Sequence, residues 1–330
     1  MPKMINWKKG MRLSDDIFRT ADAFTATQIG HAMVLAAAGR FGLFPCTRPF
    51  QVNVNISNDF IEVESLECLG LTRDGQMIEA HWDSHFTSNF DTRVPLPKGG
   101  NSQDCLLVIQ APNNEYRETS DGYCEPAYKL ALIDSDKALP GNALPVARLV
   151  FNSYAWQLDD NDFVPPCLFV SSHPLFEQQR VQFIQLLDAL EANAVAHLGT
   201  VGHGVIMSLL PQVRALRIVA DKQRDTLTPM ELLGLVQQCV SAFVTGCEMD
   251  RMINLNDIEE WKNYVKAPYS VRHVRQLIQQ GLSLCAAINE KINNFGSVMP
   301  EPAPRPVPPM PREERMAPPP VENKKILTIP

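Results

Sequence analysis

The spacing of apolar residues changes once along the chain, near residue 174. Between residues 50 and 172, apolar and polar positions alternate in short runs such as Gln51-Val-Asn-Val-Asn-Ile56. This alternation predicts half-buried strands. Many short strands with Pro, Gly, Asn and Asp between them predict a β-sandwich or barrel. We expect strands at 51–56, 60–69, 76–82, 105–110, 128–134, 146–151 and 167–171, with a tight turn at 73–75.

After residue 174 the apolar residues recur every three or four positions, which predicts amphipathic helices. Four such stripes joined by short links predict a four-helix bundle. The third helix has the clearest start, because Thr228 and Glu231 can satisfy each other's backbone amides and Pro229 suits the first turn. The four stripes are Phe183, Leu187, Leu190, Ala194 and Leu198; Val205, Leu209, Val213, Leu216 and Ala220; Leu232, Val236, Cys239, Phe243 and Cys247; and Val271, Val274, Ile278, Gly281, Cys285, Ile288 and Ile292.

A further helix is expected before the strands, with Ser14 as its cap and Gly39 as its stop. Its apolar or small positions are Phe18, Ala21, Ile29, Ala32, Met33 and Ala36. Trp7, Met11 and Phe18 could anchor a partner. We favour their packing this helix onto the sandwich.

Several bundle helices carry apolar residues outside the main stripe. A helix that is apolar on more than one side has a second packing partner. Both subunit contact and a thicker intramolecular core explain this pattern, and the sequence leaves the two open. The additional residues are Ile184, Leu186, Leu233, Leu235, Val240 and Val244.

The last segment has a different composition, since eleven of the 32 residues from Met299 onward are proline. Such a segment cannot form a core and is expected to be disordered. The predicted organisation is therefore an α+β multidomain chain. It has an N-terminal helix and β-sandwich at 1–173, a four-helix bundle or neck at 174–298, and a Pro-rich disordered tail at 299–330.

Composition narrows the classes of partner. The 330 residues carry a net charge of −7 with the two signs mixed and no long basic run, and this charge disfavours nucleic acid and anionic lipid as partners. We expect neither a signal peptide nor a membrane span, because the longest apolar run is far shorter than the roughly 20 residues that a span needs. A cytoplasmic protein is predicted, with its eight cysteines used for packing.

Three motifs could in principle carry chemistry, and each has a structural interpretation that we favour. His81, Asp83 and His85 have the i, i+4 spacing of a zinc site, but they lie in an expected strand and a third ligand is missing. Residues 199–204, Gly-Thr-Val-Gly-His-Gly, do not have the spacing of a phosphate-binding loop and are expected to link two helices. Residues 159–162, Asp-Asp-Asn-Asp, lack the spacing of a calcium loop.

We find no catalytic motif and therefore predict no catalytic residue, no cofactor-binding residue and no metal site. The predicted protein is a non-enzymatic scaffold that works through protein–protein surfaces. A hydrolase whose catalytic residues are dispersed along the sequence remains the enzymatic alternative.

Two stretches together resemble the TssK family of type VI secretion baseplate subunits. The resemblance extends over about residues 5–295, and a helical region follows the second stretch in both cases. The first stretch is Trp7, Gly10, Met11, Leu13, Phe18 and Asp22, then Phe41-Gly42-Leu43. The second is Leu144-Pro145-Val146-Ala147-Arg148-Leu149, then Leu158-Asp159, Asp162-Phe163-Val164-Pro165-Pro166-Cys167-Leu168, Ser171-Ser172 and Pro174-Leu175.

The resemblance implies a β-sandwich similar to the shoulder of phage receptor-binding proteins, a helical neck and a homotrimer. It also implies wedge partners of the TssF and TssG kind and a link to a membrane-side complex. The chain departs from the family at Lys9 and at Asp15-Asp16-Ile17, and we expect a shortened form without the C-terminal head domain. The hypothesis is that the tail, around Ile326, Leu327 and Ile329, makes the membrane-side contact instead.

The predicted function is a structural adaptor in a type VI secretion baseplate. The alternative from a neighbouring class is a receptor-binding-like or baseplate component of another contractile particle. Co-purification with wedge subunits would separate the two.

Overall fold

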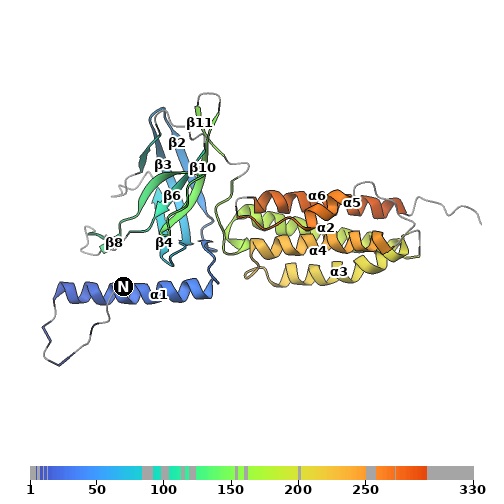
Figure 1. Ribbon diagram of the computed structural model, residues 1–330, viewed down its shortest axis with the longest axis horizontal. Helices are drawn as coiled ribbons and strands as arrows, with labels where there is room; N and C mark the ends of the chain where they lie inside the picture. Colours follow the sequence, from blue (N-terminus) through green and yellow to red (C-terminus); the bar gives the residue numbers. More distant parts are fainter. Residues whose placement is uncertain are drawn as a thin grey trace, which may run out of the picture.

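The computed structural model describes residues 5, 8–9, 11–12, 14–83, 92–97, 104–112, 116–118, 124–152, 155–159, 163–199, 202–249, 258–271 and 273–295. The strands gather in one half of the molecule and helices α2 to α6 form an elongated second half, with α1 alongside the strands (Figure 1). The predicted order of a helix, antiparallel strands and then helices is confirmed.

The first sheet is built around one long strand, β3 (Phe60–Leu71), with which the other four strands of the sheet pair in antiparallel orientation. A tight turn at Gly75, whose φ is +86°, returns the chain into β4. A left-handed φ is open to glycine at little cost. The four partner strands are β1 (Gly42–Leu43), β2 (Gln51–Ile56), β4 (Met77–Asp83) and β5 (Arg93–Pro95).

The second sheet has the order β11-β10-β6-β9, again antiparallel. A separate ribbon pairs β7 (Tyr116–Glu118) with β8 (Cys124–Pro126). The two larger sheets share one hydrophobic core, to which Ile61 and Leu66 contribute from the first and Leu107 and Leu144 from the second. The strands of the second sheet are β6 (Asp104–Gln110), β9 (Lys129–Asp134), β10 (Ala143–Asn152) and β11 (Ala155–Leu158).

One predicted strand is wrong. Residues 167–171 contribute a single parallel bridge, between Leu43 and Cys167, and then a 3-10 turn, η1 (Val170–Ser172). Pro165 and Pro166 directly precede this segment and lack the amide hydrogens that a strand ladder needs. The other six predicted strands are present, and the structure adds β1, β5, β7, β8 and β11.

The second half of the described chain contains five helices that share one core. Contacts run from α2 to α3, from α3 to α4, from α4 to α6 and from α6 back to α2, while α5 packs on α4. The helices are α2 (Pro174–Ala196), α3 (His203–Lys222), α4 (Pro229–Met249), α5 (Ile258–Val265) and α6 (Val274–Phe295).

The helical predictions are confirmed in detail at α4. The Thr228 amide donates to Glu231 Oε2 over 2.8 Å, and the Glu231 amide donates to Thr228 Oγ1 over 3.2 Å. The predicted stripes are buried except for Leu198 and Val271, which are 44% and 38% exposed because both lie outside the helices. Helix α5 was not predicted, since its buried face consists of only Trp261 and Tyr264.

The additional apolar residues on the bundle helices belong to the intramolecular core. Leu233, Val240 and Val244 are buried. Ile184, Leu186 and Leu235 are partly buried and pack against the same core. The explanation by a thicker core therefore holds, and these residues give no argument for subunit contact.

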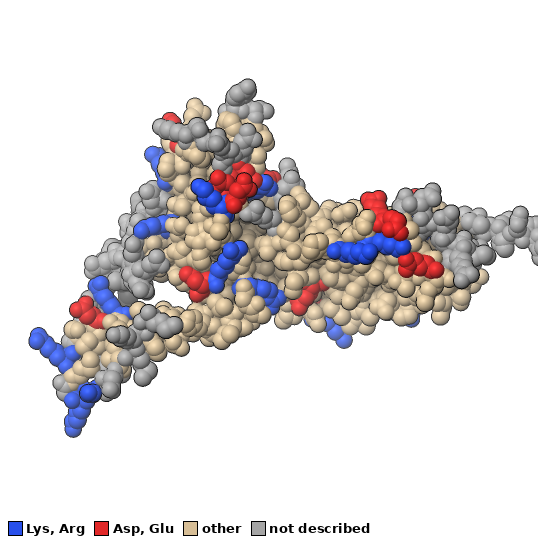
Figure 2. Space-filling model, in the orientation of Figure 1, with Lys and Arg blue, Asp and Glu red and all other residues tan. Residues whose placement is uncertain are grey.

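Helix α1 (Asp15–Ala36) begins after Ser14 as expected, although the Ser14 side chain makes no capping hydrogen bond. Gly30 meets the β3–β4 turn, where its own Cβ would lie 3.0 Å from the Gly75 carbonyl oxygen. Figure 2 shows open space between α1 and the sheets. Met11 and Phe18 are 36% and 49% exposed, so the expectation that they pack this helix onto the sheets is wrong, while Trp7 lies outside the described residues.

Most described cysteines are packing residues, as predicted. Cys68, Cys105, Cys239, Cys247 and Cys285 are buried, whereas Cys46 is exposed. Within the described ranges, one helix, α4, is long and apolar enough to span a membrane, and 50% of its most apolar window is buried inside the protein.

Candidate functional site

Arg148 stands at the centre of a polar cluster between the sheets and the helices. It lies on β10, where the register with β6 shifts between Pro145 and Ala147. A bulge of this kind changes the direction in which the following side chains point. Every residue from Ala143 to Ala147 is buried, whereas from Arg148 to the end of β10 at Asn152 only Leu149 is buried. The bulge therefore brings Arg148 to the outer face of its sheet.

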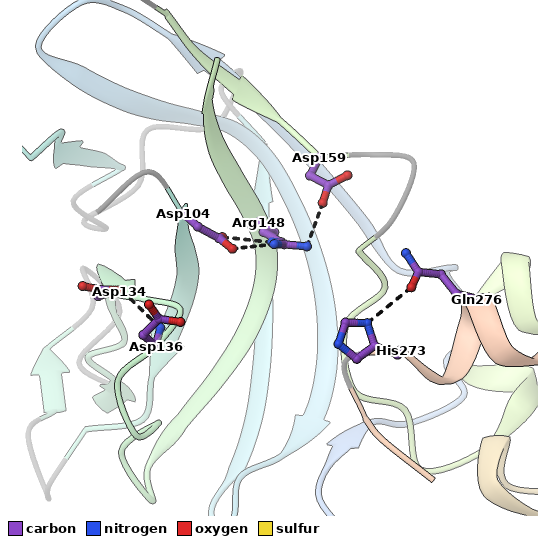
Figure 3. Close-up of polar contacts among 7 residues, drawn as sticks. All are labelled: Asp104, Asp134, Asp136, Arg148, Asp159, His273 and Gln276. Carbon is purple, nitrogen blue, oxygen red and sulfur yellow. Dashed lines mark hydrogen bonds and ion pairs between the residues drawn. The ribbon is translucent and has the colours of Figure 1, made fainter. Parts of the chain in front are cut away.

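Two carboxylates share the Arg148 guanidinium (Figure 3). Arg148 Nε donates to Asp104 Oδ1 over 2.9 Å, and Nη2 donates to the second oxygen of the same carboxylate. Arg148 Nη1 donates to Asp159 Oδ2 over 3.2 Å, and the Asp159 amide donates to the Arg148 carbonyl oxygen over 2.9 Å. The planar fork of arginine suits such two-point binding. The cluster joins β6, β10 and the residue after β11.

A cavity of about 380 Å³ adjoins this cluster. Both stretches that carry the TssK resemblance reach its wall. The first contributes Phe41, and the second contributes Pro145, Arg148, Phe163, Val164 and Pro166. The remainder of the wall comes from β6, the turn after β3, the loop between β9 and β10 and the loop before α6. The cavity therefore lies where the sheets, the connecting segment (residues 163–173) and the helices come together. We call this region the junction.

The connecting segment is held by backbone contacts on both sides. The Leu43 amide donates to the Pro166 carbonyl over 2.8 Å, and the Leu168 amide donates to the Leu43 carbonyl over 2.9 Å. A Cβ on Gly42, whose φ is +137°, would lie 2.4 Å from the Pro166 oxygen, so only glycine allows this approach. On the helical side the Val170 amide donates to the Leu227 carbonyl over 2.7 Å.

His173 completes the connection at the start of α2. Its Nδ1 accepts the Leu175 amide over 3.2 Å, and its ring lies 5.6 Å from the ring of Phe50 and 6.4 Å from that of Phe176. Burial, together with the nearby charge of Arg275, lowers the pKa of His173 from 6.5 to about 4. The ring is therefore neutral at physiological pH, as a hydrogen-bond acceptor at a helix start must be.

The hydrogen bonds at the junction hold the sheets to the helices, and the cavity beside them offers space for a ligand. The described residues contain no group of three or more His, Cys, Asp or Glu that could hold a metal ion. His273, across the junction, is close to Gln276 of α6, with 3.3 Å between Nδ1 and Oε1 (Figure 3).

The motifs weighed in the sequence lie apart from one another. His81 is on β4, beside Glu67 and Arg48 on the exposed face of the first sheet, while His85 lies outside the described residues. Gly199 and Gly202 have φ of +93° and +87° between α2 and α3, which confirms the predicted helix-to-helix link. Asp159 belongs to the Arg148 cluster, and 160–162 lie outside the described residues.

Sequence reasoning missed most of the junction. Asp104 is 44 residues away from Arg148 in the chain, and nothing in the sequence relates the two. Arg73 and Phe41 form a cation–π contact of 4.5 Å in the cavity wall. The one feature of the sequence that pointed to the junction was the TssK resemblance, because the residues around Arg148 and Pro166 belong to it.

No family model matches the sequence, and no curated protein matches it. Solved structures do match. A crystal structure of TssK is similar with a TM-score of 0.61 and 12% identity, over 88% of this chain and 69% of that one. The chain has the TssK fold.

Two further structures show the same likeness. A chain of the cryo-electron microscopy structure of the type VI secretion TssK-TssF-TssG baseplate subcomplex matches with a TM-score of 0.57 and 15% identity, over 88% of this chain and all (100%) of that one. TssK from the EAEC type VI secretion system, in complex with nanobody nb18, matches with a TM-score of 0.53 and 16% identity, over 83% and 99% of the two chains. At these identities the shared property is the fold.

Proposed function

We propose that this chain is a structural adaptor subunit of a type VI secretion baseplate. The observation that carries the proposal is the likeness to the TssK crystal structure across 88% of the chain, including both the strand-rich and the helical half. Fold alone does not determine function. Here the likeness joins the resemblance of two sequence stretches that meet in one cavity wall. We propose a structural, non-catalytic role, which the same comparison supports.

In this proposal, residues 1–173 form a β-sandwich domain similar to the shoulder of phage receptor-binding proteins, and residues 174–298 form a helical neck of four long helices with the short α5 packed on α4. One hydrophobic cluster among the strands and one among the helices support that division. They adjoin at the connecting segment, where Val164 and Val170 belong to the helical cluster and Cys167 packs against both. Residues 299–330 form a disordered Pro-rich tail.

The proposed partners are TssF-like and TssG-like wedge subunits and two further copies of this chain. The TssK-TssF-TssG subcomplex, one of the structures similar to this chain, supports wedge binding. Helix α1 supports assembly, because it exposes Ile29 (55%) and Leu35 (80%), and helices in water gain most of their stability from packing. Such a subunit works in the cytoplasm.

Co-expression with TssF-like and TssG-like proteins from the same cell tests the proposal. We expect the three proteins to elute together, and light scattering of this chain alone to give three times the 36.9 kDa monomer mass. A concentration-independent monomer would contradict the trimer. Failure of both wedge proteins to bind would contradict the adaptor role.

The tail is proposed to reach the membrane-side complex through Ile326, Leu327 and Ile329. Deletion of 299–330 should abolish recruitment to that complex while trimer formation and wedge binding persist. A shuffled tail of the same composition is the matched control, and it should behave as the deletion does. Unchanged recruitment after deletion would refute the tail's role alone.

A further inference from the structure

The wall of the junction cavity contains both cationic and apolar residues. Its volume of about 380 Å³ is at the lower end of the roughly 300–1,000 Å³ of small-molecule pockets. A cavity of this size accommodates one or two side chains. The side chains of the wall decide which kind of ligand the cavity binds.

Two cations of the wall have no anionic partner among the described residues. Arg73, in the turn after β3, places its guanidinium carbon 4.5 Å from the centre of the Phe41 ring. Stacking uses the face of a guanidinium and leaves the N–H groups at its edge available. Lys137, in the loop between β9 and β10, is exposed and also lines the cavity.

Among the described residues of the wall, Asp104 is the one carboxylate, and it is held by Arg148. Arg73, Lys137 and Arg148 against Asp104 and Asp159, the two carboxylates that Arg148 binds, leave a net charge of +1 at the cavity. This charge stands out in a chain whose net charge is −7. A concave surface of one sign concentrates ligands of the opposite sign.

Part of the cavity wall is apolar. Val271, in the loop before α6, lines the cavity and is 38% exposed, beside the polar residues Ser270 and His273. Leu139 and Val164 continue the apolar wall inward. Exposed aromatic and aliphatic residues beside a polar centre are typical of surfaces that bind protein segments.

We propose that this cavity binds an acidic segment of a partner protein, in which an Asp or Glu stands next to an apolar or aromatic residue. The carboxylate meets Arg73 and Lys137, and its apolar neighbour lies against Leu139 and Val271. Charge complementarity selects the carboxylate, and the exposed apolar surface at Val271 selects a polypeptide over a free small acid. The inference stands apart from the proposed baseplate role, since any acidic partner segment of this kind satisfies it.

The test uses the full-length chain and an array of acetylated hexapeptides. One position carries Asp, Glu, Asn, Gln or Lys, and its neighbour carries Phe, Leu, Ala or Ser. Binding should concentrate on peptides with Asp or Glu beside Phe or Leu. The variant Arg73→Glu/Lys137→Glu should lose about tenfold or more of the affinity for those peptides, and the loss should shrink at high salt.

The matched control is Lys222→Glu, which reverses an exposed charge at the end of α3 and should bind peptides as the parent does. Circular dichroism and thermal unfolding establish that all variants are folded. Three results would overturn the proposal. They are equal binding of the Asn or Gln peptides, binding that persists in the Arg73→Glu/Lys137→Glu variant, and the absence of any peptide binding. So would saturable binding of 3-phenylpropionate, a free aromatic acid, without binding of any peptide. Trimer mass and wedge binding are measured separately, so the adaptor role and this site fail independently.

Discussion

Tyr264 of α5 lies directly against the backbone of Gly281 in α6, where a Cβ would be 2.0 Å from the tyrosine hydroxyl oxygen and 2.4 Å from a methyl carbon of Val236. No side chain beyond hydrogen fits at Gly281. Because Tyr264 and Trp261 supply the whole buried face of α5, this contact fixes how the short helix packs on the helical core.

Replacement of Gly281 by alanine should therefore destabilise the protein. Overpacking of a filled core typically costs about 1–3 kcal/mol, more than the gain of up to about 1 kcal/mol in helix propensity. Denaturant unfolding measures the difference. Gly234→Ala in α4 is the matched control, because nothing lies within 4 Å of a Cβ there, and it should be neutral or stabilising. Loss of stability in both variants would show that packing at Gly281 is not the cause.

Replacement of Tyr264 by phenylalanine should be neutral or stabilising by up to about 1 kcal/mol. The Tyr264 hydroxyl is buried without a hydrogen-bond partner among the described residues, and removal of an unsatisfied polar group removes its desolvation penalty. Urea unfolding of the variant against the parent gives the value. Tyr264→Leu is the comparison that should destabilise, through lost packing. A clear loss of stability in the phenylalanine variant would mean that the hydroxyl is hydrogen-bonded in solution.

His173 should make the stability depend on pH in the mildly acidic range. Its pKa of about 4 in the folded state is below the ordinary 6.5, so the unfolded state binds the additional proton between these values. Stability is unaffected by this group above pH 6.5 and should fall as the pH drops toward 4, by on the order of 2–3 kcal/mol. Unfolding midpoints from pH 4 to 8 measure the decline.

The control for this prediction is His173→Asn, which keeps an acceptor for the Leu175 amide at the helix start but does not titrate. Its stability should decline less across the same range. The carboxylates that titrate there, such as Glu177, whose pKa is lowered by the Arg180 hydrogen bond, are common to both proteins. Identical pH profiles would contradict the role of His173.

Replacement of Arg148 by methionine should destabilise the junction by about 1–3 kcal/mol, because Asp104 and Asp159 lose their shared cation. Addition of Asp104→Asn should recover part of the loss, which a double-mutant cycle in denaturant unfolding measures. Arg214→Met is the control. It breaks the pair with Glu191, in which the arginine side chain is 56% exposed, and should change stability by less than about 1 kcal/mol. Equal losses in both variants would contradict a special role for Arg148.

Features that depend on neighbouring residues could be predicted from the sequence, whereas features that depend on distant residues could not. The turn at Gly75, the exchange of hydrogen bonds between Thr228 and Glu231, and the helix link at Gly199 and Gly202 were predictable because each depends on neighbouring residues. The strand expected at 167–171 failed because the chain turns into η1 after Leu168, and the Val170 amide bonds the distant Leu227 carbonyl in place of a neighbouring strand. Helix α5 was missed because eight residues carry little periodic signal.

The sequence by itself determined the order of the elements, their periods and most core positions, since alternation by two or by 3.6 residues follows from the geometry of one strand or one helix. Tertiary structure decided which apolar faces stay uncovered, as at Ile29 and Leu35 of α1. It also decided that Arg73, Asp104, Arg148 and Val271 line one cavity. The physical reason is that such meetings depend on contacts between residues far apart in the chain, and no local pattern records them.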